Sequence, residues 1–256
     1  MLSYYSKLSS EVYDLDKYIG LSYGDVEFYS ERLSHCKGNI LEPGVGTGRI
    51  LIPLLEKGLH VEGFDVSEEM LKICRHNCNE RGLSPTLFID KMESFKLEKE
   101  YEAIIVPTGS FLLLHNREDS IQALKNFYNH LSNNGKLIID IFLQTDIKVN
   151  EISTRTWETK TGELITLETN IVEVDYINQF TISHNRYEKW RDGVLVQTEL
   201  ERFPLRWYGI EEFKMLLEKV GFEDIIISAD YEYGQYPTNS NQIITFEASV
   251  KKNPSR

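Results

Sequence analysis

A glycine-rich stretch in the first quarter of the chain is the strongest chemical signal in the sequence. Ile40-Leu41-Glu42-Pro43-Gly44-Val45-Gly46-Thr47-Gly48-Arg49 follows a short apolar run and precedes a helical pattern. Glycines let the backbone turn sharply and approach a ligand closely, while the first N–H groups of the next helix point outward. A dinucleotide-binding loop would space its glycines G-x-G-x-x-G, but here the third glycine comes one residue early, at Gly48. The preceding acid, Glu42, disfavours a diphosphate and suits a ligand with cationic ammonium and sulfonium groups.

A second acid follows the next apolar run, Val61-Glu62-Gly63-Phe64-Asp65. A carboxylate at the end of such a strand can accept hydrogen bonds from both hydroxyls of a ribose. Val66 and Met70 come next, at positions that can pack against an adenine. The order and spacing of these residues therefore predict a site for an adenosine-containing ligand.

The elements that position these residues are read from the hydrophobic pattern. Strands are predicted over 39–42, 60–65, 86–89, 103–106 and 136–142, and helices over 49–56, 68–80 and 118–131. Short apolar strands that alternate with amphipathic helices indicate βαβ units and a parallel sheet covered on both faces. A helix over 209–220 and strands over 225–228 and 242–250 complete this part.

The pattern changes after Gln144. Segments 164–174, 179–190 and 194–207 are long, rich in β-branched residues and alternating, and Asp192-Gly193 is a strong hairpin signal. We therefore predict an antiparallel meander of three strands inserted into the α/β domain. It would lie beside the carboxyl ends of the parallel strands, where it would roof the acceptor pocket or form a dimer contact.

The motifs resemble those of class I S-adenosylmethionine-dependent methyltransferases. Glu42 to Gly48 and Asp65-Val66-Ser67-Glu68-Glu69-Met70-Leu71 are similar to the first two motifs, and Gly109 to Asp119 with Leu131 to Leu137 to the fourth and fifth. Phe203-Pro204-Leu205-Arg206-Trp207-Tyr208 is similar to a later part of the small-molecule branch. The resemblance implies an α/β fold: a doubly wound, mostly parallel seven-stranded sheet with the meander inserted.

The resemblance also implies a role for each motif residue, with S-adenosyl-L-methionine as the cofactor. Glu42 would lie near the methionyl ammonium, directly or through water. Gly44, Gly46 and Gly48 would pass beneath the methionyl moiety and the ribose. Asp65 would hold the ribose diol, and adenine would lie against two apolar side chains, Val66 and Met70.

Residues after the third and fourth strands complete the implied site. Pro107 and Thr108 would offer backbone groups to the methionyl end, and Ser110 and Phe111 would line the route to the methyl group. The family often has an acid that meets the adenine amino group, but the aligned residue here is Lys91. Two alternatives stay open: either the loop shifts to bring in Asp90, or only the backbone of Met92 contacts adenine.

Catalytic candidates are few, because a sulfonium methyl is already activated and a general base helps only if the acceptor must lose a proton. His115, after the fourth strand, and Tyr208, after the meander, are the candidates. A loop histidine and a packing tyrosine are the alternative interpretations. Tyr5 and Tyr13 resemble lid residues of this branch, although a helix packed through an aromatic stripe explains them equally well.

Composition limits the classes of molecule that the protein is expected to bind. The net charge of −12 disfavours nucleic acids, since phosphate binding relies on cationic contacts. A small-molecule acceptor fits better, and an Asn/Asp-Pro-Pro-Tyr tetrapeptide, typical of nucleobase amino methylation, is missing at 106–109. Three cysteines and no signal peptide favour a reducing cytoplasm, and no apolar run reaches bilayer-spanning length. We expect no metal site and no membrane or nucleic-acid partner, and a homodimer is the assembly that we consider.

Four regions are expected: an N-terminal helical lid (1–36), the cofactor-binding core (37–150), the inserted meander (151–207), and a C-terminal helix with strands that complete the sheet (208–256). Two other functions compete with methyl transfer. One is a non-catalytic protein that binds S-adenosylmethionine, because cofactor residues can persist after an acceptor site is lost. The other is an NAD-dependent oxidoreductase, which the glycine spacing and Glu42 disfavour.

Overall fold

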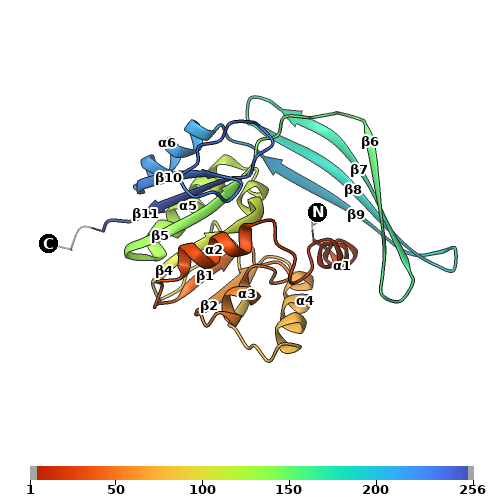
Figure 1. The fold of residues 1–256 in the computed structure, drawn as a ribbon. Coiled ribbons are helices and arrows are strands. Elements are labelled where there is room, and N and C mark those ends of the chain that lie inside the picture. Colours follow the sequence, from red (N-terminus) through yellow and green to blue (C-terminus); the bar gives the residue numbers. More distant parts are fainter. Residues whose placement is uncertain (1–4, 253–256) are drawn as a thin grey trace.

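The computed structural model describes residues 5–252 and contains two sheets (Figure 1). The larger has seven strands in the order β10-β11-β5-β4-β1-β2-β3, in which only β11 runs antiparallel to its neighbours. Its strands are β1 (Ile40–Pro43), β2 (Val61–Asp65), β3 (Leu87–Ile89), β4 (Tyr101–Val106), β5 (Leu131–Ile141), β10 (Glu223–Ala229) and β11 (Ile244–Ser249). The predicted doubly wound, mostly parallel seven-stranded sheet is confirmed.

Helices cover both faces of this sheet. On one face lie α2 (Asp25–Leu33), α3 (Leu51–Glu56) and α4 (Glu68–Asn79), and on the other α5 (Arg117–His130) and α6 (Ile210–Val220). Strand β4 has a continuous apolar sequence over 103–106 because its residues pack on both faces of the sheet. Ala103 and Ile105 pack with the first group of helices, whereas Ile104 and Val106 pack with the second. Both faces are buried, so no polar alternation is possible.

A kinked 3-10 segment, η1 (Pro107–Leu113), leaves the carboxyl end of β4. Thr108 and Gly109 both have left-handed backbone conformations, with φ of 57° and 75°. A Cβ atom on Gly109 would lie 2.5 Å from the Phe142 ring, so only glycine fits there. The kink turns η1 across the ends of the strands, where the order reverses between β1 and β4 and ligands of such sheets bind.

The inserted region is an antiparallel sheet of four strands, not three. In order they are β6 (Ile152–Glu158), β7 (Leu164–Asp175), β8 (Phe180–Arg191) and β9 (Val194–Arg206). The extra strand, β6, pairs along its whole length with β7. Sequence analysis missed it because all its side chains except the half-buried Trp157 are exposed, which leaves no apolar alternation to detect.

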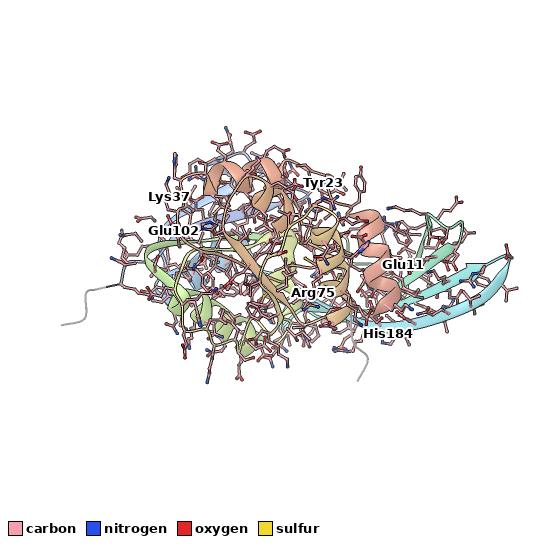
Figure 2. The ribbon with its side chains drawn as sticks, turned by 90° about the horizontal axis from the view of Figure 1, so that it is seen from below. Glu11, Tyr23, Lys37, Arg75, Glu102 and His184 are labelled. Carbon is pink, nitrogen blue, oxygen red and sulfur yellow. The ribbon has the colours of Figure 1, made fainter. Side chains whose placement is uncertain are left out.

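Helix α1 (Lys7–Asp16) lies between the α/β core and the four-stranded sheet (Figure 1), and Glu11 on α1 faces that sheet (Figure 2). Leu8 and Val12 of α1 pack with Ile165 of β7 and Tyr187 of β8 in a small separate core. None of the helices in residues 5–252 has the length and apolar character that crossing a bilayer demands.

Candidate active site

A cavity of about 530 Å³ opens at the carboxyl ends of β1 to β4. It combines the glycine loop after β1, the end of β2, the loop after β3 and segment η1 with the N-terminal region. Its lining residues are Tyr5, Tyr13, Gly44, Gly46, Phe64, Asp65, Val66, Met70, Asp90, Lys91, Met92, Glu93, Ser110, Leu113, Leu114, His115, Asn116 and Asp119.

The glycine loop lines this cavity with backbone atoms, because Gly44 and Gly46 have no side chains. Gly44 and Gly46 have left-handed φ values of 72° and 56°, which L residues with side chains rarely adopt. A Cβ atom on Gly44 would lie 3.0 Å from Met92 Cε and 3.2 Å from Ser110 Cβ. Side chains here would therefore strain the loop and fill the cavity.

Asp65 ties the glycine loop to the end of β2. Its Oδ2 accepts a hydrogen bond from the Gly46 N–H at 2.9 Å, and its Oδ1 accepts one from the Ser67 N–H at 2.9 Å. Burial raises the pKa of this carboxyl group, and the N–H groups oppose that rise. Ser67 in turn caps α4, because its hydroxyl accepts from the Met70 N–H at 3.1 Å. Asp65 thus shapes the loop and faces the cavity at once.

Glu42 lies buried at the base of the glycine loop. Its Oε2 has no hydrogen-bond partner among residues 5–252. Burial raises the pKa of Glu42 well above its ordinary value, although Arg49 opposes the rise. Arg49 is itself buried and forms an ion pair with Asp25. A buried carboxyl group with an open oxygen lacks a donor, and a cationic ammonium group would supply it.

Comparisons with known proteins agree with this geometry. Residues 40–135 match the family described as Methyltransferase domain. YqeM of Bacillus subtilis (strain 168), whose name describes it as a methyltransferase, is 26% identical over 247 residues, which cover 90% of this chain and 97% of YqeM. The glycine/sarcosine N-methyltransferase of Aphanothece halophytica is 28% identical over 209 residues, covering 80% of this chain and 74% of that enzyme.

Solved structures share the fold at lower identity. The CcbJ methyltransferase of Streptomyces caelestis superposes with a TM-score of 0.74 at 19% identity, covering 97% of this chain and 98% of CcbJ. The sugar N-methyltransferase KedS8 of Streptoalloteichus sp. superposes with a TM-score of 0.73 at 19% identity, covering 98% of both chains. The chain is a class I S-adenosylmethionine-dependent methyltransferase.

The cavity of this methyltransferase brings together most of the residues predicted to bind S-adenosylmethionine. They lie at the ends of β1, β2 and β3, and comprise Gly44, Gly46, Asp65, Val66, Met70, Asp90 and Met92. The unpartnered oxygen of Glu42 and the bare glycine backbone fit the ammonium and methionyl parts of the cofactor.

Glu42 and the remaining predicted cofactor residues lie outside the cavity lining. Gly48 packs against helices, since a Cβ atom there would lie 2.9 Å from Cys74 Sγ. Pro107 and Thr108 begin η1 behind the lining residue Ser110. Asp90, Lys91 and Met92 all line the cavity, and Asp90 Oδ1 accepts from the Lys91 N–H at 2.8 Å. Both alternatives for adenine recognition stay predictions.

The two catalytic candidates differ in position. His115 lines the cavity, and burial followed by the charge of Arg202 lowers its pKa, whereas Asp119 opposes this effect. Tyr208 is buried, packs against Phe111, and its hydroxyl donates to Ser120 Oγ at 2.8 Å. The structure therefore brings His115 to the cavity and places Tyr208 in the core behind it.

The predicted lid residues reach the cavity from the N-terminal region. Tyr5 and Tyr13 line it, and their rings meet edge-on with centroids 5.8 Å apart. The Tyr5 carbonyl accepts a hydrogen bond from Ser67 Oγ at 2.6 Å, which links the lid to the Asp65 turn. Tyr5 also meets Phe203 of β9 edge-on, with centroids 5.9 Å apart. The four-stranded sheet thus lies beside the carboxyl-end cavity.

Sequence analysis missed several polar residues around the cavity. Asn116 and Asp119 line it, and Asn116 caps α5 by accepting from the Glu118 N–H at 2.8 Å. Both lie in the stretch Gly109 to Asp119 that resembles a family motif, and their spacing is that of a helix cap, but neither feature assigns them to the cavity. Two buried charges outside the cavity lining, Asp140 and Arg206, were assigned no role from sequence, although Arg206 lies in the stretch 203–208 that resembles a family motif, because their contacts join distant elements.

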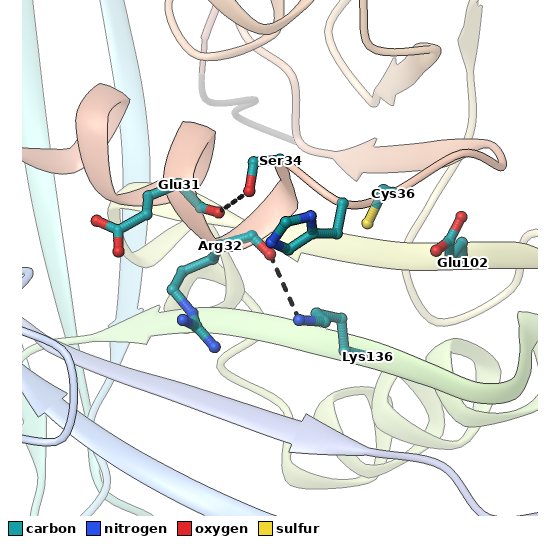
Figure 3. Close-up of a pocket in the computed structure, with 7 residues that line it drawn as sticks. Glu31, Arg32, Ser34, Cys36, Glu102 and Lys136 are labelled. Atoms are coloured by element: carbon teal, nitrogen blue, oxygen red, sulfur yellow. Dashed lines mark hydrogen bonds between the residues drawn. The ribbon is translucent and has the colours of Figure 1, made fainter.

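A second, smaller cavity of about 220 Å³ lies at the opposite edge of the sheet, near the amino ends of β4 and β5 (Figure 3). Lys136 Nζ lies 3.4 Å from the Arg32 carbonyl there, and both side chains form ion pairs with Glu247. The lining residues are Glu31, Arg32, Ser34, His35, Cys36, Glu102 and Lys136. The side chains of Arg32 and Lys136 are thus already paired, and none of the predicted site residues lies in this cavity.

Cofactor binding is expected to release a proton from Glu42. Burial raises the pKa of this carboxyl group and so favours its protonated form in the free protein, whereas a bound ammonium would favour the ionised form. We therefore expect S-adenosylhomocysteine, which carries the same ammonium, to release up to about one proton near pH 7. Titration calorimetry in buffers of different ionisation enthalpy measures this number. Glu42→Gln should abolish the release, and a buffer-independent enthalpy for the parent protein would contradict the assignment.

Proposed function

We propose that this methyltransferase transfers the methyl group to the nitrogen atom of a small-molecule amine. The observation that carries the proposal is that a histidine and a carboxylate line the same end of the cavity, formed by η1 and the start of α5, which we take as the acceptor end. His115 and Asp119 line that end together with Ser110 and Asn116. Among the lining residues the one cationic side chain, Lys91, follows β3 at the opposite, adenine-binding end. An ammonium group would meet a carboxylate here, whereas an anionic acceptor would find no cationic side chain in this part of the lining, although the charge of Arg202 reaches His115 from outside it.

The chain's own residues would prepare such an acceptor. S-adenosylmethionine, when bound, supplies a methyl group already activated on a sulfonium. Asp119 would attract the protonated amine, and His115, whose pKa burial and Arg202 lower, would accept its proton. The lid residues Tyr5 and Tyr13 would exclude water, and alignment for in-line displacement can supply about 7–11 kcal/mol.

Two relatives support a nitrogen acceptor. The Aphanothece enzyme is named for glycine and sarcosine, and KedS8 is described as a sugar N-methyltransferase. Both acceptors are small and carry an amine. The net charge of −12 supports a small-molecule acceptor, because it would repel the phosphates of a nucleic acid.

A screen of small amines tests the proposal. The protein is incubated with S-adenosylmethionine and, separately, amino sugars, amino acids, biogenic amines and matched hydroxyl or carboxylate analogues that lack the amine. Release of S-adenosylhomocysteine is measured against an acceptor-free control. We expect turnover with at least one amine and none with its analogue. Turnover confined to hydroxyl or thiol acceptors, or methyl incorporation into labelled tRNA or duplex DNA, would contradict the proposal.

A further inference from the structure

Segment η1 and the two residues after it form one wall of the cavity, which we take as the acceptor wall, and they follow a kinked 3-10 path rather than a regular α-helix or strand. Ser110, Leu113, Leu114 and His115 all line the cavity from this segment. Its kink at Thr108 and Gly109 is left-handed, and Thr108 is a β-branched residue that rarely adopts such a conformation. Strained backbone of this kind persists only where surrounding groups enforce it.

A buried carboxylate enforces the start of the segment. Asp140, in β5, is fully buried, and its Oδ2 accepts from the N–H of Thr108 at 2.8 Å. The same oxygen accepts from the Tyr231 hydroxyl at 3.1 Å, and Oδ1 accepts from Thr245 Oγ1 at 2.7 Å. Burial raises the pKa of Asp140 to about 6, because the core disfavours the ionised carboxylate. The three hydrogen-bond donors oppose this rise.

A buried guanidinium group holds the other end. Arg206, the last residue of β9, is 1% exposed, and its Nη1 donates to the His115 carbonyl at 2.8 Å. Its Nε and Nη2 have no well-aligned hydrogen-bond acceptor within residues 5–252. Neither Arg206 nor Asp140 forms an ion pair with any residue of that described part of the chain. Their charges therefore act on the backbone of the segment rather than on each other.

Buried charges without a counter-ion are costly, and neutral residues would fill a purely structural position better. Both charges instead form charge-assisted hydrogen bonds to the same irregular segment, one at each end. We propose that Asp140 and Arg206 are positioning residues that clamp residues 108–115 from the core sheet and from the four-stranded sheet, and so orient His115 and Ser110 toward the acceptor. The proposal rests on the placement of the acceptor beside His115.

Hydrogen–deuterium exchange of the full chain tests the Asp140 end without needing an acceptor. Asp140→Asn should speed exchange over 107–115 by at least about tenfold, the effect of losing a charge-assisted hydrogen bond, while β2 stays unchanged. Thr108→Gly relieves the left-handed strain, so the double variant should exchange more slowly than Asp140→Asn alone. Thr108→Gly alone is the control, since it leaves Asp140 intact. Unchanged exchange in Asp140→Asn, or a double variant as fast as the single one, would overturn the proposal.

The Arg206 end is tested by a matched pair of variants, which also decides the matter if Asp140→Asn does not fold. Arg206→Lys keeps a cation that can reach the His115 carbonyl, whereas Arg206→Met keeps only the length. We expect near-parent exchange over 107–115 in the lysine variant and at least about tenfold faster exchange in the methionine variant. Equal exchange in both variants would overturn the clamp.

Methyl transfer provides the functional readout once an amine acceptor is found. The variants with fast exchange should lose kcat at least about tenfold, with a smaller change in the KM for S-adenosylmethionine, and Arg206→Lys should rescue the loss seen in Arg206→Met. Loss of kcat without rescue would contradict a positioning role. If no amine is turned over, the proposed function fails, but the exchange measurements still decide whether the clamp exists.

Discussion

Replacing His115 with alanine will lower kcat for an amine acceptor by about 10²- to 10⁴-fold, the range for removal of a positioned general base. The structure places this imidazole in the cavity wall and holds its pKa below 6.5 through burial and Arg202. The neutral form accepts the proton, so kcat of the parent should fall as pH drops through that lowered pKa. Steady-state kinetics across pH 5 to about 9 measures both effects.

Tyr208→Phe is the matched control for this experiment. Its hydroxyl donates to Ser120 Oγ in the core and does not line the cavity. We expect a cost of about 1 kcal/mol in unfolding free energy and nearly parent activity. If the His115 variant keeps the kcat of the parent, His115 is not the general base. A Tyr208→Phe variant as impaired as His115→Ala would instead support the sequence-based assignment of Tyr208.

Replacing Asp65 with alanine will weaken the binding of S-adenosylhomocysteine by about 1–3 kcal/mol, the usual loss for hydrogen bonds to a charged group. The carboxylate lines the cavity and also accepts hydrogen bonds from Gly46 and Ser67. Its loss therefore removes the predicted ribose contact and loosens the glycine loop together. Titration calorimetry on folded protein gives the affinity.

Glu98→Ala, an exposed acid away from the cavity, controls for the change in net charge. Asp65→Asn separates the two roles of Asp65, because one amide oxygen can still accept from the loop but the charge is gone. We expect Asp65→Asn to fall between the parent and Asp65→Ala. If Asp65→Ala is folded and binds as tightly as the parent, the ribose assignment is wrong.

Most of the core and of the cofactor end could be predicted from the sequence because their signals are local. Glycines at fixed spacing after an apolar run predict a loop with positions that carry no side chain. Gly44 has the left-handed backbone conformation that glycine adopts readily. Asp65 follows its strand directly, so the parallel sheet alone brings it to the same edge. Gly48 shows the limit of this reasoning, since it shares the motif but packs against Cys74 instead of lining the cavity.

The acceptor end could not be predicted in the same way, because its contacts join elements far apart in the chain. Arg206 reaches the His115 carbonyl across 91 residues, and Tyr231 reaches Asp140 across 91 residues. No local pattern indicates that either charge is buried or what it holds. Tyr208 likewise follows a motif, but packing with Phe111 and Ser120 decides where its hydroxyl points.

Binding of S-adenosylhomocysteine and of NADH to the same preparation tests the central claim most directly. Titration calorimetry with each ligand in turn compares the two cofactor classes that a glycine loop can serve. We predict saturable binding of S-adenosylhomocysteine at one site per chain and no binding of NADH. Gly46→Val should abolish the former, because its side chain would enter the cavity from a left-handed backbone position. Binding of NADH without binding of S-adenosylhomocysteine or S-adenosylmethionine would contradict the account.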